Sequence, residues 1–227
     1  MTGNSERRDT AAGQAGAQRV EAWWVNPALY TPITFLARVA LRLFFRLKVR
    51  GYENIPHGVG VVIASNHQSY LDPIIIGVSN DEPVTFMARE SLFRKRLFGW
   101  LIRRTGAFPV KRGSADRSAM HEAIRRLRAG ARLVVFPEGT RTLDGSLGRV
   151  RSGPALLAEK AQVPIVPAVI RGAYEAWPRS RKLFRFRPIS ITYGRPIAAP
   201  AAGKGGAREE LTRNLQDSLE SLMAETQ

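Results

Sequence analysis

Short apolar runs alternate along this chain with segments of helical periodicity, and this alternation leaves few folds open to it. Runs rich in branched apolar residues, typical of buried strands, lie at 59–64, 84–88, 107–110, 132–136, 165–170 and 189–193. Helical patterns separate most of them, at 92–104, 114–128, 155–162 and 208–223. This order predicts an α/β fold, a single domain whose mixed, mostly parallel sheet is flanked by helices. In such a sheet, chemistry is expected at the turns that lead from strands into helices.

The composition excludes several classes of site. The 227 residues are 44% hydrophobic and 24% charged, which suits one globular domain with a full core. Cysteine is absent, so the chain has no disulfide, no thiolate metal site and no cysteine nucleophile. The Gly-x-Ser-x-Gly pattern is also absent, which excludes the serine elbow of the α/β-hydrolases.

The charge balance points to an anionic partner. Lysine and arginine number 35 against 19 acidic residues, a formal net charge of +16. Arginine dominates the basic residues, and its planar fork suits phosphate. No convincing nucleic-acid-binding motif accompanies the charge, so an anionic membrane surface or a phosphorylated substrate is expected as partner, and nucleic acid is not.

Four segments are expected along the chain. Residues 1–21 lack apolar periodicity, which is typical of a disordered leader. Residues 22–49 carry an amphipathic helical pattern, and residues 50–196 form the α/β core. Residues 197–227 read as a linker rich in Pro, Gly and Ala that leads to a final helix. No internal repeat and no second domain are visible.

The segment at 22–49 has the character of a membrane-association helix. It begins with Trp23 and Trp24, after which Pro32 opens a helical pattern. One face is basic and the opposite face apolar: Arg38, Arg42 and Arg46 against Ile33, Leu36, Ala40, Leu43, Phe44 and Leu47. The charges leave no stretch of roughly 20 uncharged apolar residues, so a spanning helix is not expected. The pattern predicts peripheral, monotopic association at the cytoplasmic face, and it also fits packing on the domain.

The stretch Asn66-His67-Gln68-Ser69-Tyr70-Leu71-Asp72 follows an apolar run and places a histidine five positions before a carboxylate. Five residues along a continuous helix would turn these side chains apart, so His67 is expected in a turn before a helix that Ser69 caps. A bend there lets Asp72 reach His67 and orient it as a base. The alternative is a capping box in which Ser69 and Asp72 satisfy only backbone donors. This stretch alone does not separate the two.

A second polar turn, Phe136-Pro137-Glu138-Gly139-Thr140-Arg141, places a carboxylate and a guanidinium three residues apart. They form either a local ion pair of little energetic value or a site in which Arg141 grips a phosphate while Glu138 orients a hydroxyl. The cations Lys111 and Arg112 follow the strand at 107–110, where Lys111 fits a solvated basic rim.

Two further features complete the pattern. The apolar stretch at 163–172 contains two prolines and fits a short edge strand or a pocket wall. His57 and His121 have no metal-ligand spacing, so no metal site is predicted.

Taken in order, four blocks of the sequence resemble the glycerolipid acyltransferase family typified by 1-acylglycerol-3-phosphate acyltransferase. They are Asn66 to Asp72, Gly106 to Arg112, Phe136 to Arg141 and Val163 to Pro167, and the resemblance covers residues 50–195. Lys111 departs from the acidic residue that often precedes the second-block arginine in this family. The resemblance implies that the acceptor binds to Arg112, Glu138, Gly139, Thr140 and Arg141.

The activity that the resemblance implies is transfer of a fatty acyl group to the free hydroxyl of a lysophospholipid, foremost 1-acylglycerol-3-phosphate. The co-substrate is an acyl thioester, acyl-CoA or acyl-carrier protein, and no cofactor is expected. His67 is the general base and Asp72 orients it, because an alcohol needs a base that works near neutral pH. The alternatives are a relative with another lipid acceptor, or a non-catalytic basic protein that binds membrane or nucleic acid.

Overall fold

The structure is a computed structural model that describes residues 24–111, 116–201 and 206–225. Its strands run in chain order as β1 (Lys48–Arg50), β2 (Val61–Ser65), β3 (Val84–Arg89), β4 (Ala107–Val110), β5 (Arg132–Val135), β6 (Ile165–Arg171) and β7 (Ser190–Tyr193). Its helices are α1 (Pro27–Phe45), α2 (Asp72–Ser79), α3 (Arg96–Arg104), α4 (Arg117–Arg128), α5 (Gly153–Ala161), α6 (Ala173–Ala176) and α7 (Ala207–Glu225), with short 3-10 turns at Tyr52–Asn54 and Glu90–Arg94.

The strands form one sheet in the order β1-β7-β6-β2-β5-β3-β4. Every neighbouring pair is parallel except β6 and β7, which confirms the predicted mixed, mostly parallel sheet. The residues of β2 and nearly all of β6 are buried, so these central strands read as continuous apolar runs in the sequence.

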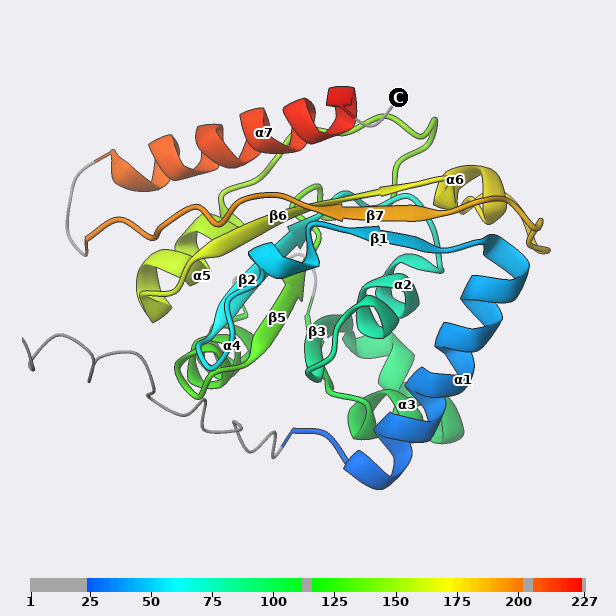
Figure 1. The fold of residues 1–227 in the computed structure, drawn as a ribbon. Helices are drawn as coiled ribbons and strands as arrows, with labels where there is room; N and C mark the ends of the chain where they lie inside the picture. The colour runs from blue at the N-terminus through cyan, green and yellow to red at the C-terminus, as the bar shows by residue number, and fades with distance from the viewer. Residues whose placement is uncertain (1–23, 112–115, 202–205, 226–227) are drawn as a thin grey trace, which may run out of the picture.

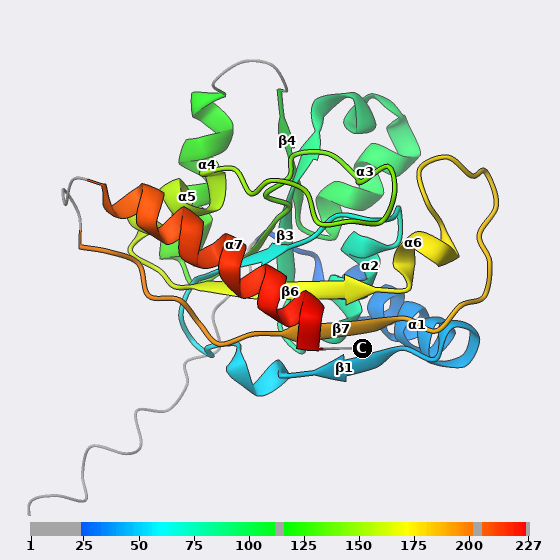
Figure 2. The same cartoon turned by 90° about the horizontal axis from the view of Figure 1, so that it is seen from above.

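Helices cover both faces of the sheet (Figures 1 and 2). One face packs on α1 and α2, which contribute Leu41, Phe45, Ile75 and Ile76 to its core. The other face packs on α4, α5 and α7. The final helix α7 therefore belongs to the domain core, since its apolar side chains at Leu211, Leu215 and Leu219 are buried there. The leader predicted at 1–21 lies outside the described residues.

Two predictions about local structure were wrong. The stretch at 163–172 is an interior strand, because β6 pairs with both β2 and β7. Pro167 is tolerated there since it lies just past the last β6–β7 pair, where its carbonyl accepts a 2.8 Å hydrogen bond from the N–H of Gly194. The N-terminal helix begins at Pro27, five residues before Pro32, because the side chain of Asn26 caps it there.

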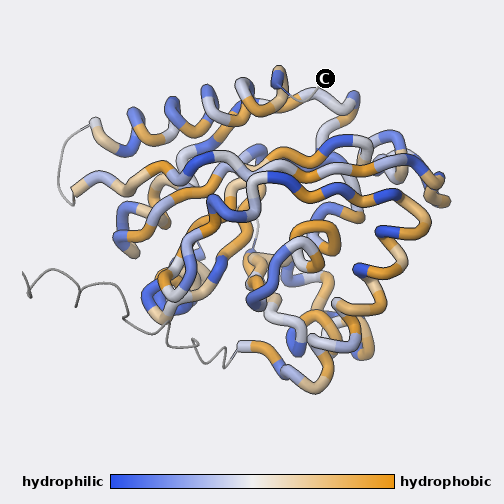
Figure 3. Tube along the Cα trace, viewed as in Figure 1, coloured by the Kyte–Doolittle hydropathy of each residue, from blue (hydrophilic) through white to orange (hydrophobic). Residues whose placement is uncertain are grey.

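The helix α1 is tied to the domain by a narrow inner face. Tyr30, Leu41 and Phe45 are buried, and the guanidinium of Arg38 donates to the carbonyls of Val78 and Asn80 at 2.7 and 2.9 Å. Much of the predicted apolar stripe stays uncovered, since Leu36 and Leu43 are 67% and 70% exposed. Figure 3 shows that most of the trace of α1 is hydrophobic. By length and composition alone, α1 is also the one helix among the described residues that could cross a membrane.

Trp24 does not serve as the predicted membrane anchor. Its side chain is buried in a small cluster with Val25, Tyr30 and Ala131, and Trp23 lies outside the described residues. A short antiparallel bridge between Val25 and Thr105 holds the residues before α1 against the end of α3.

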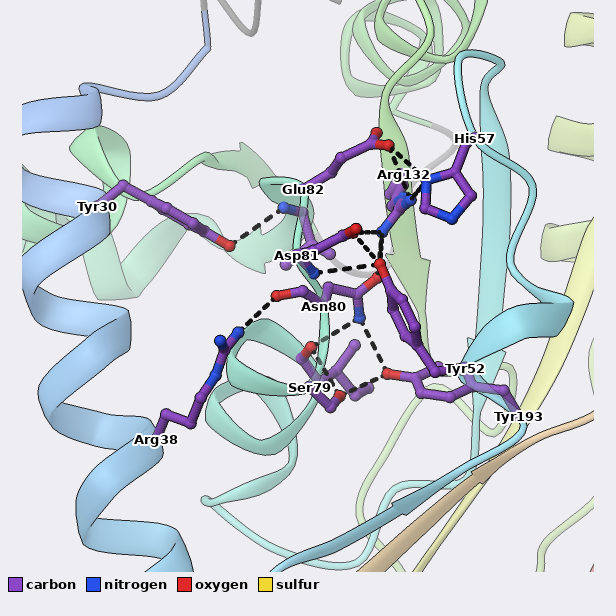
Figure 4. Close-up of polar contacts among 12 residues, drawn as sticks. Tyr30, Arg38, Tyr52, His57, Ser79, Asn80, Asp81, Glu82, Arg132 and Tyr193 are labelled. Atoms are coloured by element: carbon purple, nitrogen blue, oxygen red, sulfur yellow. Dashed lines mark hydrogen bonds and ion pairs between the residues drawn. The ribbon is translucent and has the colours of Figure 1, made fainter. Parts of the chain in front are cut away.

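A buried arginine holds together the end of the sheet where β5 begins (Figure 4). The side chain of Arg132 is fully buried, and its guanidinium donates to four acceptors at 2.8–3.0 Å: Tyr52 Oη, Asn80 Oδ1, Asp81 Oδ1 and Glu82 Oε1. The fold, unlike the sequence spacing, brings His57, Asp81 and Glu82 together as the one group of described residues whose side chains lie close enough to hold a metal ion. The guanidinium already provides the positive charge at this cluster, which supports a structural function for it.

The Arg132 network makes a stability prediction. Arg132→Lys should lower the free energy of unfolding by about 2–3 kcal/mol in urea denaturation. The single ammonium group of lysine cannot reach all the acceptors that the planar guanidinium fork of arginine reaches. Half-exposed Asp81 keeps the loss below that of a fully buried pair. The exposed Arg128→Lys is the matched control and should change stability by about 0.5 kcal/mol or less. Equal stability of the two variants would show that the network contributes nothing.

Candidate active site

The first and third motifs meet at one edge of the sheet. His67 follows β2 and Glu138 follows β5, and these strands are parallel neighbours in the sheet. Their carboxyl ends therefore lie side by side, the place where α/β sheets collect functional groups. Hydrogen bonds between residues about 70 positions apart in the chain hold the first and third motifs together.

His67 and Asp72 form the predicted pair. The ring Nδ1 of His67 lies 2.8 Å from Asp72 Oδ2, and the Asp72 carboxylate is completely buried. A carboxylate only accepts, so Nδ1 carries the proton and Nε2 of the neutral ring is left as a proton acceptor. The ring stacks on Phe136, with centroids 3.9 Å apart and planes 15° apart, which fixes its orientation. The His67 side chain is 15% exposed to solvent.

The same Asp72 oxygen also closes the turn between β2 and α2. It accepts hydrogen bonds from the backbone N–H groups of Gln68 and Ser69 at 2.6 and 2.7 Å. The sequence left open whether Asp72 orients His67 or satisfies only backbone donors. In the structure Asp72 does both at once. The Oδ1 atom is buried without a hydrogen-bond partner among the described residues.

The predicted cap at Ser69 was wrong. The N-cap of α2 is Leu71, and Ser69 Oγ instead accepts from the N–H of Leu71 and donates to the carbonyl of Trp177. The reason is that Asp72 folds the preceding residues into a turn, which delays the start of the helix to Asp72 itself. The backbone donors of Gln68, Ser69 and Leu71 are all engaged, so none of these three is free to stabilise an oxyanion.

Glu138 holds the backbone of His67. Its Oε1 accepts from the N–H of His67 at 2.7 Å and its Oε2 from the N–H of Gly148 at 2.9 Å. Burial raises the pKa of Glu138, and these two backbone donors lower it in part. The N–H of Thr142 donates to the carbonyl of His67 at 2.8 Å. The turn after β5 therefore forms hydrogen bonds with both the N–H and the carbonyl of His67. The predicted contact of Glu138 with substrate stays a prediction.

Arg141 presents a guanidinium that the protein does not saturate. Its Cζ lies 3.6 Å from the centroid of the Tyr70 ring, and its Nη1 is buried without a hydrogen-bond partner among the described residues. Gly139 and Thr140 are exposed, and Glu138, Thr140 and Arg141 line a pocket of about 1000 Å³ bounded by the start of α7. The predicted Arg112 lies outside the described residues.

Several residues that hold the site were missed from the sequence. The side-chain amide of Asn66 exchanges two hydrogen bonds with the backbone of Ile170, at 2.8 and 2.9 Å, and pins the turn to β6. The amide of Gln68 donates to the carbonyl of Gly145. A polar residue directly after a fully buried strand is a signal for Asn66, but its partner 104 positions away is not visible in the sequence.

Comparisons with known proteins identify the family. A family model described as Acyltransferase matches residues 46–171, more than half of the chain. The chain belongs to the acyltransferase family. This confirms the resemblance indicated by the four sequence blocks.

Two named relatives match most of the chain. The chain is 30% identical over 161 residues to the 1-acyl-sn-glycerol-3-phosphate acyltransferase of Bacillus subtilis, covering 70% of this chain and 78% of that protein. It is also 30% identical over 167 residues to the chloroplastic 1-acyl-sn-glycerol-3-phosphate acyltransferase BAT2 of Brassica napus, which covers 71% of this chain. The chain spans about half the length of that plant relative, 48%.

A solved structure supports the same assignment. The crystal structure of the 1-acyl-sn-glycerophosphate acyltransferase PlsC from Thermotoga maritima matches with a TM-score of 0.73 and 27% sequence identity. The match covers 87% of this chain and 80% of that one, so it includes elements beyond residues 46–171. The α/β architecture described above is therefore shared with this relative.

The geometry of the pair predicts the effect of neutralising Asp72. Asp72→Asn keeps an oxygen that can accept from His67, but it removes the negative charge that stabilises a protonated ring. We expect acyl transfer to fall by about 10⁴-fold in kcat, as for the carboxylate of a serine-protease triad. Glu53→Gln, which removes a carboxylate charge from an exposed position in the 3-10 turn at the other end of the strands, is the matched control and should leave kcat unchanged. An Asp72→Asn enzyme within tenfold of wild type would show that the carboxylate acts only on the turn.

Proposed function

We propose that this protein transfers a fatty acyl group from an acyl thioester to the free hydroxyl of a lysophospholipid, foremost 1-acylglycerol-3-phosphate. The observation that carries the proposal is a histidine paired with a buried carboxylate and bonded through its backbone to the turn that bears Arg141. The names of the relatives from Bacillus subtilis and Brassica napus support this acceptor.

His67 acts as the general base in this proposal. Its Nε2 takes the proton of the acceptor hydroxyl as the oxygen attacks the thioester carbonyl, while the bond from Nδ1 to Asp72 stabilises the imidazolium that forms. The thiol of the donor leaves when the tetrahedral intermediate collapses, and the acyl ester is the product. The chain has no cysteine and no serine elbow, so direct attack is simpler than an acyl-enzyme.

Arg141 binds the phosphate of the acceptor in this proposal. A buried guanidinium nitrogen without a protein partner is costly, and a bidentate phosphate satisfies it. Tyr70 holds the guanidinium plane from one side, so the fork is oriented before substrate arrives. Gly139 and Thr140 lie in the same exposed turn and Arg112 is the second candidate cation.

The donor is acyl-CoA or acyl-carrier protein, and the reaction as proposed needs no cofactor. The enzyme works at an anionic membrane surface on the cytoplasmic face, and no nucleic acid takes part. The exposed stripe of α1 at Leu36, Leu43 and Phe44 supports association with one leaflet. The bonds from Arg38 to α2 support a helix that stays against the domain instead of crossing the bilayer.

An acceptor panel tests the proposal. The purified protein should acylate 1-acylglycerol-3-phosphate faster than the matching monoacylglycerol or lysophosphatidylcholine. Arg141→Ala should lower kcat/KM for the phosphate acceptor by about 10- to 100-fold, the value of a charged hydrogen bond, and for monoacylglycerol by only a few fold. The phosphate-free acceptor is thus the internal control for damage to the fold. Equal losses for both acceptors would contradict phosphate binding by Arg141, and preference for another lipid would replace the proposed acceptor.

A further inference from the structure

The connection between α6 and β7 is an unusual surface loop, here called the basic aromatic loop and defined as residues 179–187. It carries five cations and three large apolar side chains and no acidic residue: Arg179, Arg181, Lys182, Leu183, Phe184, Arg185, Phe186 and Arg187. Every residue in it is exposed, with Leu183 at 80% and Phe186 at 61%. None of the five cationic side chains forms an ion pair or hydrogen bond with the described part of the chain.

This loop continues the uncovered face of α1. Figures 1 and 2 both place it beside the C-terminal end of that helix. Phe186 stacks on Phe44 with ring centroids 5.2 Å apart, and Phe184 lies 6.0 Å from Phe45. The exposed apolar side chains of α1 and of the loop therefore form one surface. Neither α1 nor the loop contains an acidic residue, so the whole surface is apolar and cationic.

The loop also adjoins the candidate active site. Phe184 lies 5.9 Å from Trp177, and Trp177 lies 5.3 Å from Tyr70, all between ring centroids. Tyr70 in turn carries the guanidinium of Arg141 on its face. A row of rings thus runs from the loop to the phosphate-binding side chain proposed above.

We propose that the basic aromatic loop and the outer face of α1 form one docking surface for an anionic lipid bilayer. Cations that alternate with aromatic and aliphatic side chains match the headgroup region, where charges meet lipid phosphates and rings sit at the apolar boundary. The proposal extends the membrane association already assigned to α1 and adds a second, separate contact. Docking in this way places the bilayer beside Tyr70, so a lipid acceptor reaches Arg141 without crossing bulk water.

An acidic protein partner is the other class of ligand that five cations suit. The apolar side chains favour the bilayer, since Leu183, Phe184 and Phe186 are exposed at the centre of the loop and join the stripe of α1. A surface that only recognised acidic side chains would not need exposed apolar groups at its centre.

Vesicle flotation with the full-length enzyme tests the proposal. The loop variant Arg181→Ser/Lys182→Ser/Arg185→Ser loses three cations, and each cation near an anionic surface contributes about fivefold to binding. We expect about 100-fold weaker partitioning onto vesicles that contain 30% phosphatidylglycerol, a composition chosen as the anionic probe. The control is Arg128→Ser/Lys160→Ser/Arg195→Ser, which removes the same charge from exposed positions at the opposite end of the strands and should bind within about threefold of wild type.

A third variant separates the loop from α1. Leu36→Ser/Leu43→Ser removes exposed apolar contacts of α1 and should weaken binding to neutral phosphatidylcholine vesicles as well. If that variant loses binding while the loop variant keeps it, the loop proposal is overturned and the function of α1 stands. If the loop variant keeps vesicle binding but raises KM for an acidic acyl-carrier protein, the loop docks a protein instead. Equal losses in the loop variant and its control would reduce the effect to net charge, which also overturns the proposal.

Discussion

One oxygen of Asp72 accepts three hydrogen bonds, from the imidazole of His67 and from the backbone N–H groups of Gln68 and Ser69. The chain must turn sharply after β2 for this to happen, and the turn delays α2 until Asp72 itself. A buried carboxylate is stable only when its charge is compensated, and here backbone donors and an imidazole do so together. The conformation of the turn and the tautomer of the histidine therefore depend on the same atom.

The rest of the sheet edge is arranged around that turn. Glu138 and Thr142, in the turn after the neighbouring strand β5, hold both backbone groups of His67, and Asn66 ties the turn after β2 to β6 on the other side. His67 is thus fixed by β2, β5 and β6 at once. Rigid placement matters because a base must meet its proton within hydrogen-bond reach.

The opposite end of the strands carries the stabilising contacts. Arg132 collects acceptors from the 3-10 turn at Tyr52–Asn54 and from the end of α2, and Arg38 bonds the last carbonyls of the same helix. The helix α2 is therefore anchored at its C-terminus to the domain and to α1, while its first residue, Asp72, serves the site. Stability and chemistry occupy different ends of one short helix.

Local patterns made much of this structure predictable. Buried strands such as β2 and β6 are continuous apolar runs, and the two polar turns after β2 and β5 are short enough to stand out. Strand β1 was missed because its three residues are exposed and only its pairing with β7 makes it a strand. The start of α1 was misplaced because Pro32 resembles a first-turn proline, although Asn26 followed by Pro27 is an earlier start signal of the same kind in the sequence.

What the sequence does not contain is the set of long-range partners. The bond from Glu138 to the backbone of His67 joins residues 71 positions apart, so its carboxylate looked like a free substrate contact. The burial of Trp24 depends in the same way on Ala131. Motif recognition identified which residues meet, but only the fold shows which of their atoms remain available.

Acyl transfer by His67→Ala is the most direct measurement. With 1-acylglycerol-3-phosphate and an acyl thioester, the kcat of the variant should fall by about 10²- to 10⁴-fold, the contribution of a general base. Its thermal unfolding midpoint should stay close to wild type, because Asp72 keeps its two backbone donors. A folded His67→Ala protein that turns over within tenfold of wild type would contradict the assignment of His67 as the base.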